Sequence, residues 1–256
     1  MSVLASKSPL YTTYRTLGLL YLFFVFGLFL DSFYMVNITK NAQLYANGLM
    51  LIVFFITFFK VNKRLKEQMI NAVLIGFFGE YLFSILLGMY TYRLENIPHY
   101  IPFGHAFVYI AVLCFSKAAA IKTIGKSIEK LLTISIIIYA TLFLIFKNDV
   151  FGFVMTAATL LILKNKPKER LFYLTMYVSV VVLELIGTTY KCWFWPPIAW
   201  NVLEFLPSAN PPSGISLFYF LLDLGTLWLY KQRHRDAWQR MKNIRTIRLN
   251  NSISTN

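Results

Sequence analysis

Cysteine and charge are both scarce in this chain, and each shortage excludes a class of protein. Only two of the 256 residues are cysteines, so the fold is not a disulfide-rich secreted domain, and we expect both thiols to be free. Charged residues make up 14% of the chain and hydrophobic residues 57%. An ordinary soluble domain has about 25% charged residues. A chain so poor in charge is expected to expose a large apolar surface.

The motifs of several enzyme classes are also missing. The sequence has no H-E-x-x-H zinc motif, no P-loop, no glycine-rich dinucleotide fingerprint and no paired aspartate-rich motif for diphosphate and magnesium. Two of the three histidines, His99 and His105, have nearby carboxylates, but their spacing matches no strong metal signature. We therefore expect no cofactor and no metal.

Long apolar runs, in contrast, recur along the whole chain. A membrane helix needs about 20 apolar residues, and helices are the expected structure because lipid cannot hydrogen-bond to the backbone. The runs are at residues 16–36, 44–59, 69–90, 101–121, 131–146, 149–163, 171–190 and 214–230. The sequence thus predicts an all-α transmembrane bundle of about eight spans. The fifth and sixth runs are short enough to form a tilted hairpin instead of two full crossings.

Basic residues alternate between the segments that separate these runs. The N-terminal segment, the even-numbered loops and the C-terminal tail hold 21 of the 25 lysines and arginines, and the four odd-numbered loops hold one each. Because cytoplasmic loops are rich in lysine and arginine, the alternation predicts that both termini are cytoplasmic. It also accounts for the net charge of +14 without a nucleic-acid partner.

The two halves of the chain share a pattern. Each half has, in the same order, a glutamate inside an apolar run, a Pro-x-Gly turn and a tyrosine: Glu80, Pro102, Gly104 and Tyr109, then Glu184, Pro212, Gly214 and Tyr219. We therefore expect a parallel repeat of four plus four helices. Residues 1–130 would form the first unit, 131–230 the second and 231–256 a basic tail. Chance matching in apolar sequence is the alternative interpretation.

Acidic residues inside the apolar runs mark the candidate site. An ionised carboxylate near the bilayer centre costs about 2.5 to 3.5 kcal/mol, so each needs a partner, a proton or a wet cavity. The four that lie there are Asp31, Glu80, Glu184 and Asp223. The alternative is that these groups only hydrogen-bond across helices and fix their packing.

Two of these carboxylates are candidates for proton transfer. We expect Glu80 and Glu184 to donate or accept protons, with His105 as their partner. The same face of the fourth run carries Tyr109, four residues after His105. On the last run Asp223 follows Tyr219 by four residues, and we expect it to orient that phenol.

The two longest outer loops, at residues 91–100 and 191–213, supply candidate substrate contacts, and each has a plainer interpretation. The candidates are Tyr92, Arg93, Trp193, Trp195 and Asn210. The tryptophans are typical of an aromatic belt at the membrane surface, which we favour over substrate stacking. Arg93 either pairs with Glu95, which we also favour, or binds an anionic headgroup. Asn210 either caps the helix that follows or belongs to a polar lid.

The basic tail has apolar residues at three-residue spacing. Trp238, Met241 and Ile244 would lie on one face of a short amphipathic helix bound to anionic lipid. A topology anchor with a disordered end is the alternative.

Four short strings resemble an uncharacterised family of bacterial integral membrane proteins. They are Tyr90-Thr-Tyr-Arg93, Ile97-Pro98, Pro102-Phe-Gly-His105 and Asn210-Pro-Pro-Ser-Gly214. This resemblance implies no activity. A glutamate in mid-helix followed by glycine, aromatics and a proline-rich loop is also similar to carotenoid-biosynthesis membrane hydratases. That second resemblance implies protonation and hydration of an isoprenoid double bond.

The sequence therefore favours a membrane enzyme that performs acid–base chemistry on a lipid or isoprenoid near the outer leaflet. Its expected partners are membrane lipids and a hydrophobic small molecule. A small proton-coupled transporter, in which the same carboxylates titrate during alternating access, is one alternative. A structural or assembly protein whose polar residues bind a partner's helix is another. A water-filled path that reaches both faces of the membrane would favour a transporter. A pocket that opens only outward or sideways would favour an enzyme.

Overall fold

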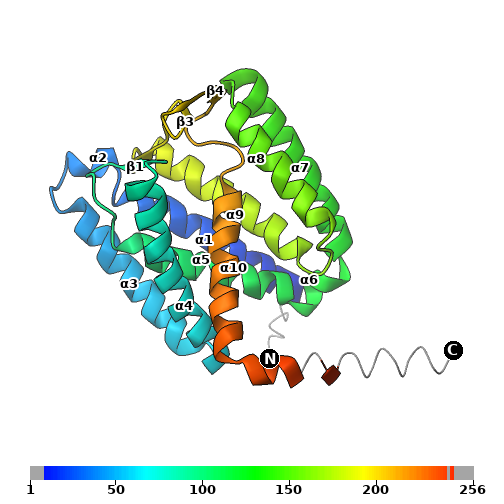
Figure 1. Ribbon diagram of the computed structural model, residues 1–256. Coiled ribbons are helices and arrows are strands. Elements are labelled where there is room, and N and C mark those ends of the chain that lie inside the picture. Colours follow the sequence, from blue (N-terminus) through cyan, green and yellow to red (C-terminus); the bar gives the residue numbers. More distant parts are fainter. Residues whose placement is uncertain (1–8, 241–242, 245–256) are drawn as a thin grey trace, which may run out of the picture.

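The structure, a computed structural model, describes residues 9–240 and 243–244, and this part of the chain is mostly helical (Figure 1). The long helices are α1 (Pro9–Phe29), α3 (Ala42–Lys60), α4 (Lys63–Glu80), α5 (Tyr100–Lys117), α7 (Gly125–Lys147), α8 (Val150–Lys164), α9 (Arg170–Thr189) and α10 (Ser216–Arg233). Shorter helical segments are α2 (Phe33–Val36), η1 (Tyr81–Leu86) and α6 (Ala119–Thr123). Each predicted run contains one long helix, so the all-α bundle is confirmed.

Six helical stretches in the described residues are long and apolar enough to cross a membrane. They are Thr13–Val36, Ala42–Lys60, Lys63–Leu86, Tyr100–Lys117, Gly125–Lys147 and Arg170–Thr189. Large apolar side chains cover their outer faces: Phe26 is 67% exposed, Phe78 66% and Ile145 66%. A soluble monomer rarely exposes apolar patches of this extent. The chain is therefore a multi-pass membrane protein.

Helix α5 lies at the centre of the bundle. It packs against α4, α3, α9 and α1, and 56% of its apolar stretch is buried, as in α9, against 11% in α7. The α7–α8 hairpin lies on one side of this centre and the α3–α4 pair on the other (Figure 1). The polar groups that need shielding from lipid are thus expected on α5 and its neighbours.

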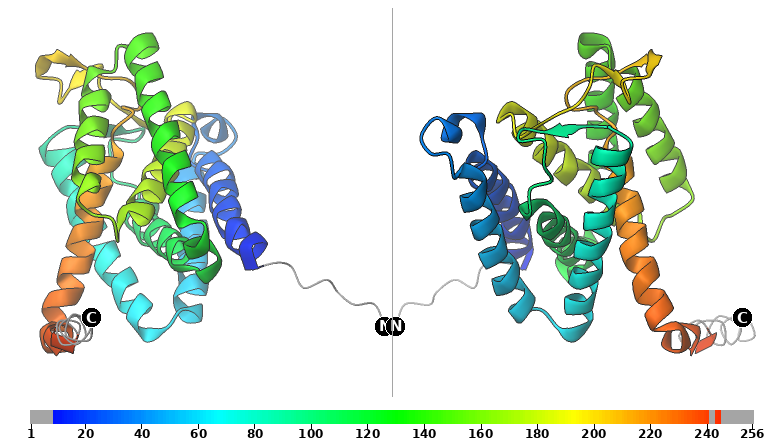
Figure 2. Two further views of the ribbon diagram at one scale, coloured as in Figure 1. Left: turned by 90° about the vertical axis from the view of Figure 1, so that its right-hand side faces the viewer. Right: turned by 60° about the vertical axis from the view of Figure 1, so that its left-hand side comes forward.

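Two short antiparallel ribbons cover one end of the bundle. Strand β1 (Thr91–Tyr92) pairs with β2 (Trp193–Phe194), and β3 (Ile198–Ala199) pairs with β4 (Leu203–Pro207). Figures 1 and 2 show the β3–β4 ribbon at the end opposite the C-terminal part of α10. The β1–β2 ribbon brings together the two aromatic loops, which are about 100 residues apart in the sequence.

The basic tail turns away from the end of α10. Residues 235–240 are helical, and the Lys231 ammonium lies 4.9 Å from the ring centroid of Trp238. Met241, part of the expected apolar face, lies outside the described residues. The amphipathic tail helix therefore stays a prediction.

Candidate functional site

Glu80 is the last residue of α4, and the backbone changes just after it. The chain continues as the π-helix η1, a widened turn that is frequent at functional sites. It then turns at Gly88, whose φ of +57° is easily adopted only by glycine. This turn brings two phenols back to Glu80: the hydroxyls of Tyr90 and Tyr92 each donate to its Oε2 at 2.6 Å.

His105 on α5 contacts the other oxygen of the same carboxylate. Its Nε2 lies 2.9 Å from Glu80 Oε1, and both side chains are buried. Gly76, one turn before Glu80, allows this approach, because a Cβ there would lie 3.2 Å from His105 Cδ2. Burial and the neighbouring Glu80 carboxylate raise the pKa of the Tyr92 phenol well above its ordinary value. Tyr92 therefore stays protonated and donates to Glu80, while a single hydrogen bond joins Glu80 to His105.

Glu184 on α9 is held by a second set of donors. The indole Nε1 atoms of Trp193 and Trp195 donate to its Oε2 at 2.8 and 3.0 Å, and the Tyr219 hydroxyl donates to Oε1 at 3.1 Å. Gly187 leaves room for the Trp193 indole, which a Cβ at this position would strike. Because an indole N–H can only donate, Oε2 of Glu184 is an unprotonated acceptor.

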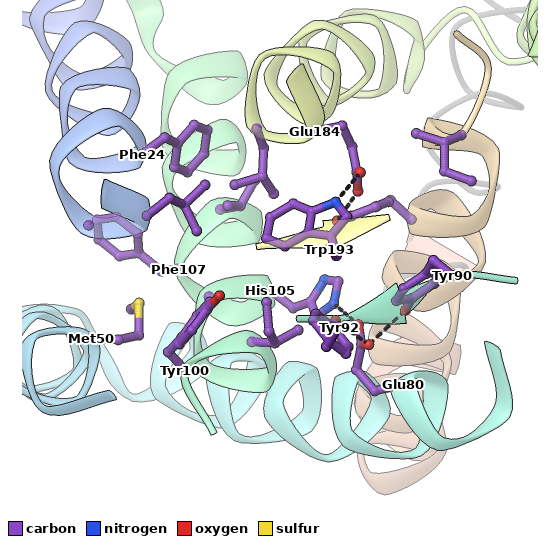
Figure 3. Close-up of a pocket in the computed structure, with 18 of the residues that line it drawn as sticks. Phe24, Met50, Glu80, Tyr90, Tyr92, Tyr100, His105, Phe107, Glu184 and Trp193 are labelled. Atoms are coloured by element: carbon purple, nitrogen blue, oxygen red, sulfur yellow. Dashed lines mark hydrogen bonds and ion pairs between the residues drawn. The ribbon is translucent and has the colours of Figure 1, made fainter. Parts of the chain in front are cut away.

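Aromatic contacts join the two carboxylate clusters into one site. Tyr92 lies directly opposite Trp193 in the β1–β2 ribbon, and the rings of His105 and Tyr219 have centroids 4.9 Å apart. Figure 3 shows Glu80 and Glu184 reaching in from opposite sides, with His105 and Trp193 between them. The two acids, the histidine and their donors therefore face a common space.

That space is an apolar pocket, which we call the aromatic cavity, with about 990 Å³ of empty space inside it and at its open mouth. Helices α1, α3, α5, α9 and α10 and the β1–β2 ribbon contribute its walls. Phe24, Met50 and Phe107 lie on one side of the residues drawn in Figure 3, and the two glutamates lie on the other. The cavity thus has an apolar arm and a polar end, which suits a chain-like hydrophobic molecule.

Two predicted site residues lie elsewhere. Tyr109 and Asp223 line a second pocket, the basal cavity, together with lysines of the basic loops. The expectation that Asp223 orients Tyr219 is wrong, because the Tyr219 hydroxyl donates to Glu184. Residues four apart on a helix are displaced by about 6 Å along its axis, and here that displacement separates the two cavities.

The favoured partner of Arg93 is also wrong. Its guanidinium forms an ion pair with the buried Asp31, and its Nε donates to the Asp31 carbonyl oxygen at 3.1 Å. The Tyr100 hydroxyl donates to the same carboxylate at 2.8 Å. Glu95 is exposed to solvent and keeps its hydration, whereas the buried Asp31 requires a counter-charge. The Arg93 guanidinium is therefore engaged by Asp31, and Arg93 does not line the aromatic cavity.

The outer-loop candidates Tyr92, Trp193 and Trp195 do line the aromatic cavity. The tryptophans are only 3% and 7% exposed, so the favoured belt at the membrane surface is wrong for these two. Asn210 does not line this cavity. Its Oδ1 accepts a hydrogen bond from the Trp195 backbone N–H at 3.0 Å and so holds the loop between α9 and α10 together. Tyr90 also belongs to the site but is not among the predicted site residues, although the Tyr-x-Tyr pair after a helical glutamate and a glycine is a signal that could have found it.

Among the described residues, no group of three His, Cys, Asp or Glu side chains is placed to hold a metal ion. No protein-family model matches this sequence, and neither a curated protein nor a solved structure is detectably similar to it. The function is therefore argued from the geometry of the site.

Proposed function

We propose that this protein is a membrane enzyme that protonates a double bond of an isoprenoid or similar unsaturated lipid. The observation that carries the proposal is the placement of two buried, fully hydrogen-bonded carboxylates, Glu80 and Glu184, at one end of an elongated aromatic cavity. An apolar cavity excludes water and strengthens the interactions of these charges with a bound molecule.

The Glu80–His105 pair supplies the proton. It shares one hydrogen bond of 2.9 Å, and Glu80 Oε2 is already occupied by Tyr90 and Tyr92. The proton between Oε1 and Nε2 moves to one carbon of the double bond, whose electron pair forms the new C–H bond. The neighbouring carbon becomes a carbocation. The same pair then takes back a proton from an adjacent carbon, or water adds to the cation and gives up a proton to the pair.

Glu184 stabilises the positive charge that develops on the substrate. Its Oε2 accepts two indole N–H bonds, which keep this oxygen unprotonated. The aromatic rings that line the cavity present negative faces to a cation, each contact contributing about 0.5 to 2 kcal/mol. Fixed groups that oppose a developing charge are an efficient source of catalysis.

In this proposal the protein has eight spans, with both termini in the cytoplasm of a bacterial cell, so that the site lies toward the outer leaflet. The two carboxylate clusters support the internal repeat. In each cluster, a glutamate near the end of a helix accepts hydrogen bonds from aromatic residues of the following loop. The same glutamate also forms a hydrogen bond with a side chain of the next long helix. The repeat places the substrate between its two units.

A proton-coupled carrier of a hydrophobic cation is the second candidate. It is favoured by the two carboxylates among aromatic rings, a combination that binds ammonium groups. The aromatic and basal cavities are separate pockets, however, whereas a carrier needs alternating access from both faces. The enzyme is therefore the better-supported candidate.

Comparative lipidomics tests the proposal. Cells with the wild-type protein are compared with cells that lack it and with cells that carry Glu80→Gln or Glu184→Gln. We expect both variants to cause the same lipid to accumulate as the deletion does, with product reduced about 100-fold or more, because general acid catalysis contributes about 10² to 10⁴ in rate.

Glu204→Gln is the matched control, since Glu204 is exposed on the β4 strand of the outer loop. It should leave the lipid profile unchanged, and all variants should be compared at equal protein levels. A wild-type profile identical to that of the deletion strain would overturn the enzyme. Proton-driven uptake of a lipophilic ammonium ion by proteoliposomes would then support the carrier.

A further inference from the structure

The basal cavity lies apart from the carboxylate site and has a composition of its own. It has about 1,410 Å³ of empty space inside it and at its open mouth. Exposed cations from five segments of the chain surround it: Arg64, Lys117, Lys122, Lys126 and Lys168. None of them forms an ion pair with a described residue, and the acidic side chains that share the lining are Glu129, Glu169 and Asp223. The rim is therefore net positive.

The floor of this cavity is polar and buried. Gln68, Tyr109, Tyr173 and Asp223 are 2%, 5%, 7% and 8% exposed. Gln68 Oε1 and Asp223 Oδ2 are buried acceptors without a hydrogen-bond partner. A buried polar atom left without a partner costs about 1 to 3 kcal/mol. Both acceptors belong to side chains that line the basal cavity, so a small rotation of either side chain would turn its oxygen toward a ligand's donors.

We propose that the basal cavity binds a phosphate ester of a polyol, with its phosphate at the rim and its hydroxyl groups at the floor. The five cations attract the phosphate and hold it at the rim. The hydroxyl groups donate to Gln68 and Asp223, the two acceptors that lack partners. This ligand is either a soluble ester such as glycerol phosphate or the headgroup of a glycerophospholipid.

The proposal does not depend on the reaction in the aromatic cavity. Adjacent residues of two helices separate the pockets: Val108 and Leu222 line the aromatic cavity, and Tyr109 and Asp223 line the basal one. A ligand in the basal cavity therefore contacts α5 and α10, the helices that carry His105 and Tyr219. Either site can be disproved while the other stands.

Binding to the purified full-length protein in phosphatidylcholine nanodiscs tests the proposal. Glycerol 1-phosphate and inorganic phosphate are titrated calorimetrically, and retention of phosphatidylglycerol is measured by native mass spectrometry. We expect Lys122→Gln/Lys126→Gln to weaken binding about tenfold or more. The matched control is Lys63→Gln/Lys130→Gln, which removes the same charge from basic residues that do not line the cavity and should change binding less than twofold.

The floor is tested by Asp223→Leu, which removes an unpartnered buried carboxylate and is expected to leave the protein folded. The variant should lose the preference for glycerol phosphate over inorganic phosphate. Binding of glycerol phosphate indicates a soluble ester, and retention of phosphatidylglycerol alone indicates a lipid headgroup. The proposal is overturned if neither ligand binds, if both double variants weaken binding equally, or if the preference survives Asp223→Leu.

Discussion

At the scale of single residues, the end of the bundle that carries the β1–β2 ribbon depends on one buried ion pair. Asp31 is 1% exposed, and Arg93 and Tyr100 satisfy its two carboxylate oxygens. Arg93 follows β1 directly, so the pair ties the strand to the end of the first membrane helix. Removing one partner of a buried pair costs about 3 to 5 kcal/mol, because the other charge is left uncompensated.

Arg93→Met is therefore expected to lower the melting temperature of the detergent-solubilised protein by about 10 °C. The double variant Asp31→Leu/Arg93→Met should recover part of this loss, since no unpaired charge remains. Glu95→Gln should melt within a degree or two of the wild type, because Glu95 is exposed. Equal losses for Arg93→Met and Glu95→Gln would contradict this account. Differential scanning fluorimetry provides the measurement.

At the scale of elements, one aspartate holds the long loop between α9 and α10 against the α7–α8 hairpin. Asp149 caps α8 by accepting from Gly152 N at 3.1 Å, and it also accepts from Ala209 N at 3.0 Å and Ser213 N at 2.7 Å. These bonds fix the end of the segment that runs from Trp195 to α10. The loop that carries a donor to Glu184 is therefore anchored on a different helix from Glu184 itself.

Asp149→Asn should loosen this loop, because an amide offers one acceptor oxygen where the carboxylate offers two. The loss of one buried hydrogen bond, about 1 to 3 kcal/mol, corresponds to roughly tenfold faster exchange of the backbone amides at positions 209 and 213. Hydrogen–deuterium exchange with mass spectrometry checks this. Asp236→Asn, near the tail, is the control and should leave exchange in the loop unchanged.

The elements themselves could be predicted from the sequence, and their tertiary partners could not. Runs of apolar residues are a local signal, so the helices follow from hydropathy alone. The partner of Arg93 depends instead on which carboxylate the fold buries. The role of Asp149 depends on a loop some 60 residues away. Sequence periodicity carries no information on either choice.

At the scale of the whole molecule, the sequence also predicted that Glu80, His105, Glu184 and Tyr219 would belong to one site, and the fold brings them together. Carboxylates in apolar helices must face one another or a cavity, which accounts for the meeting of Glu80 and Glu184. The prediction is wrong for Asp223, since this residue lines the basal cavity and not the aromatic one. The division follows from how α5 and α10 pack, which only the assembled fold defines.

The number of crossings is the remaining property of the whole molecule, and it depends on α8 and α10, the two long helices that are not among the six apolar stretches of membrane-spanning length. With 15 residues, α8 is about 22 Å long, shorter than the hydrocarbon core of about 30 Å. It nevertheless runs beside α7, and lysines flank it at positions 147 and 164 to 168. A short helix can still cross if the bilayer thins locally or the flanking lysines extend to the interface.

We therefore expect α8 to cross, so that Lys147 and Lys166 lie on opposite sides of the membrane. In a Cys114→Ser/Cys192→Ser background, Lys147→Cys should react with a membrane-impermeant maleimide in intact cells, as should Lys40→Cys. Lys166→Cys should react only after permeabilisation, as should Lys63→Cys. If Lys166→Cys labels in intact cells as readily as Lys147→Cys, α8 does not cross. Such labelling would also conflict with the β1–β2 ribbon, which joins the loops at residues 91–100 and 191–213 on one side of the bundle and therefore requires an even number of crossings between them.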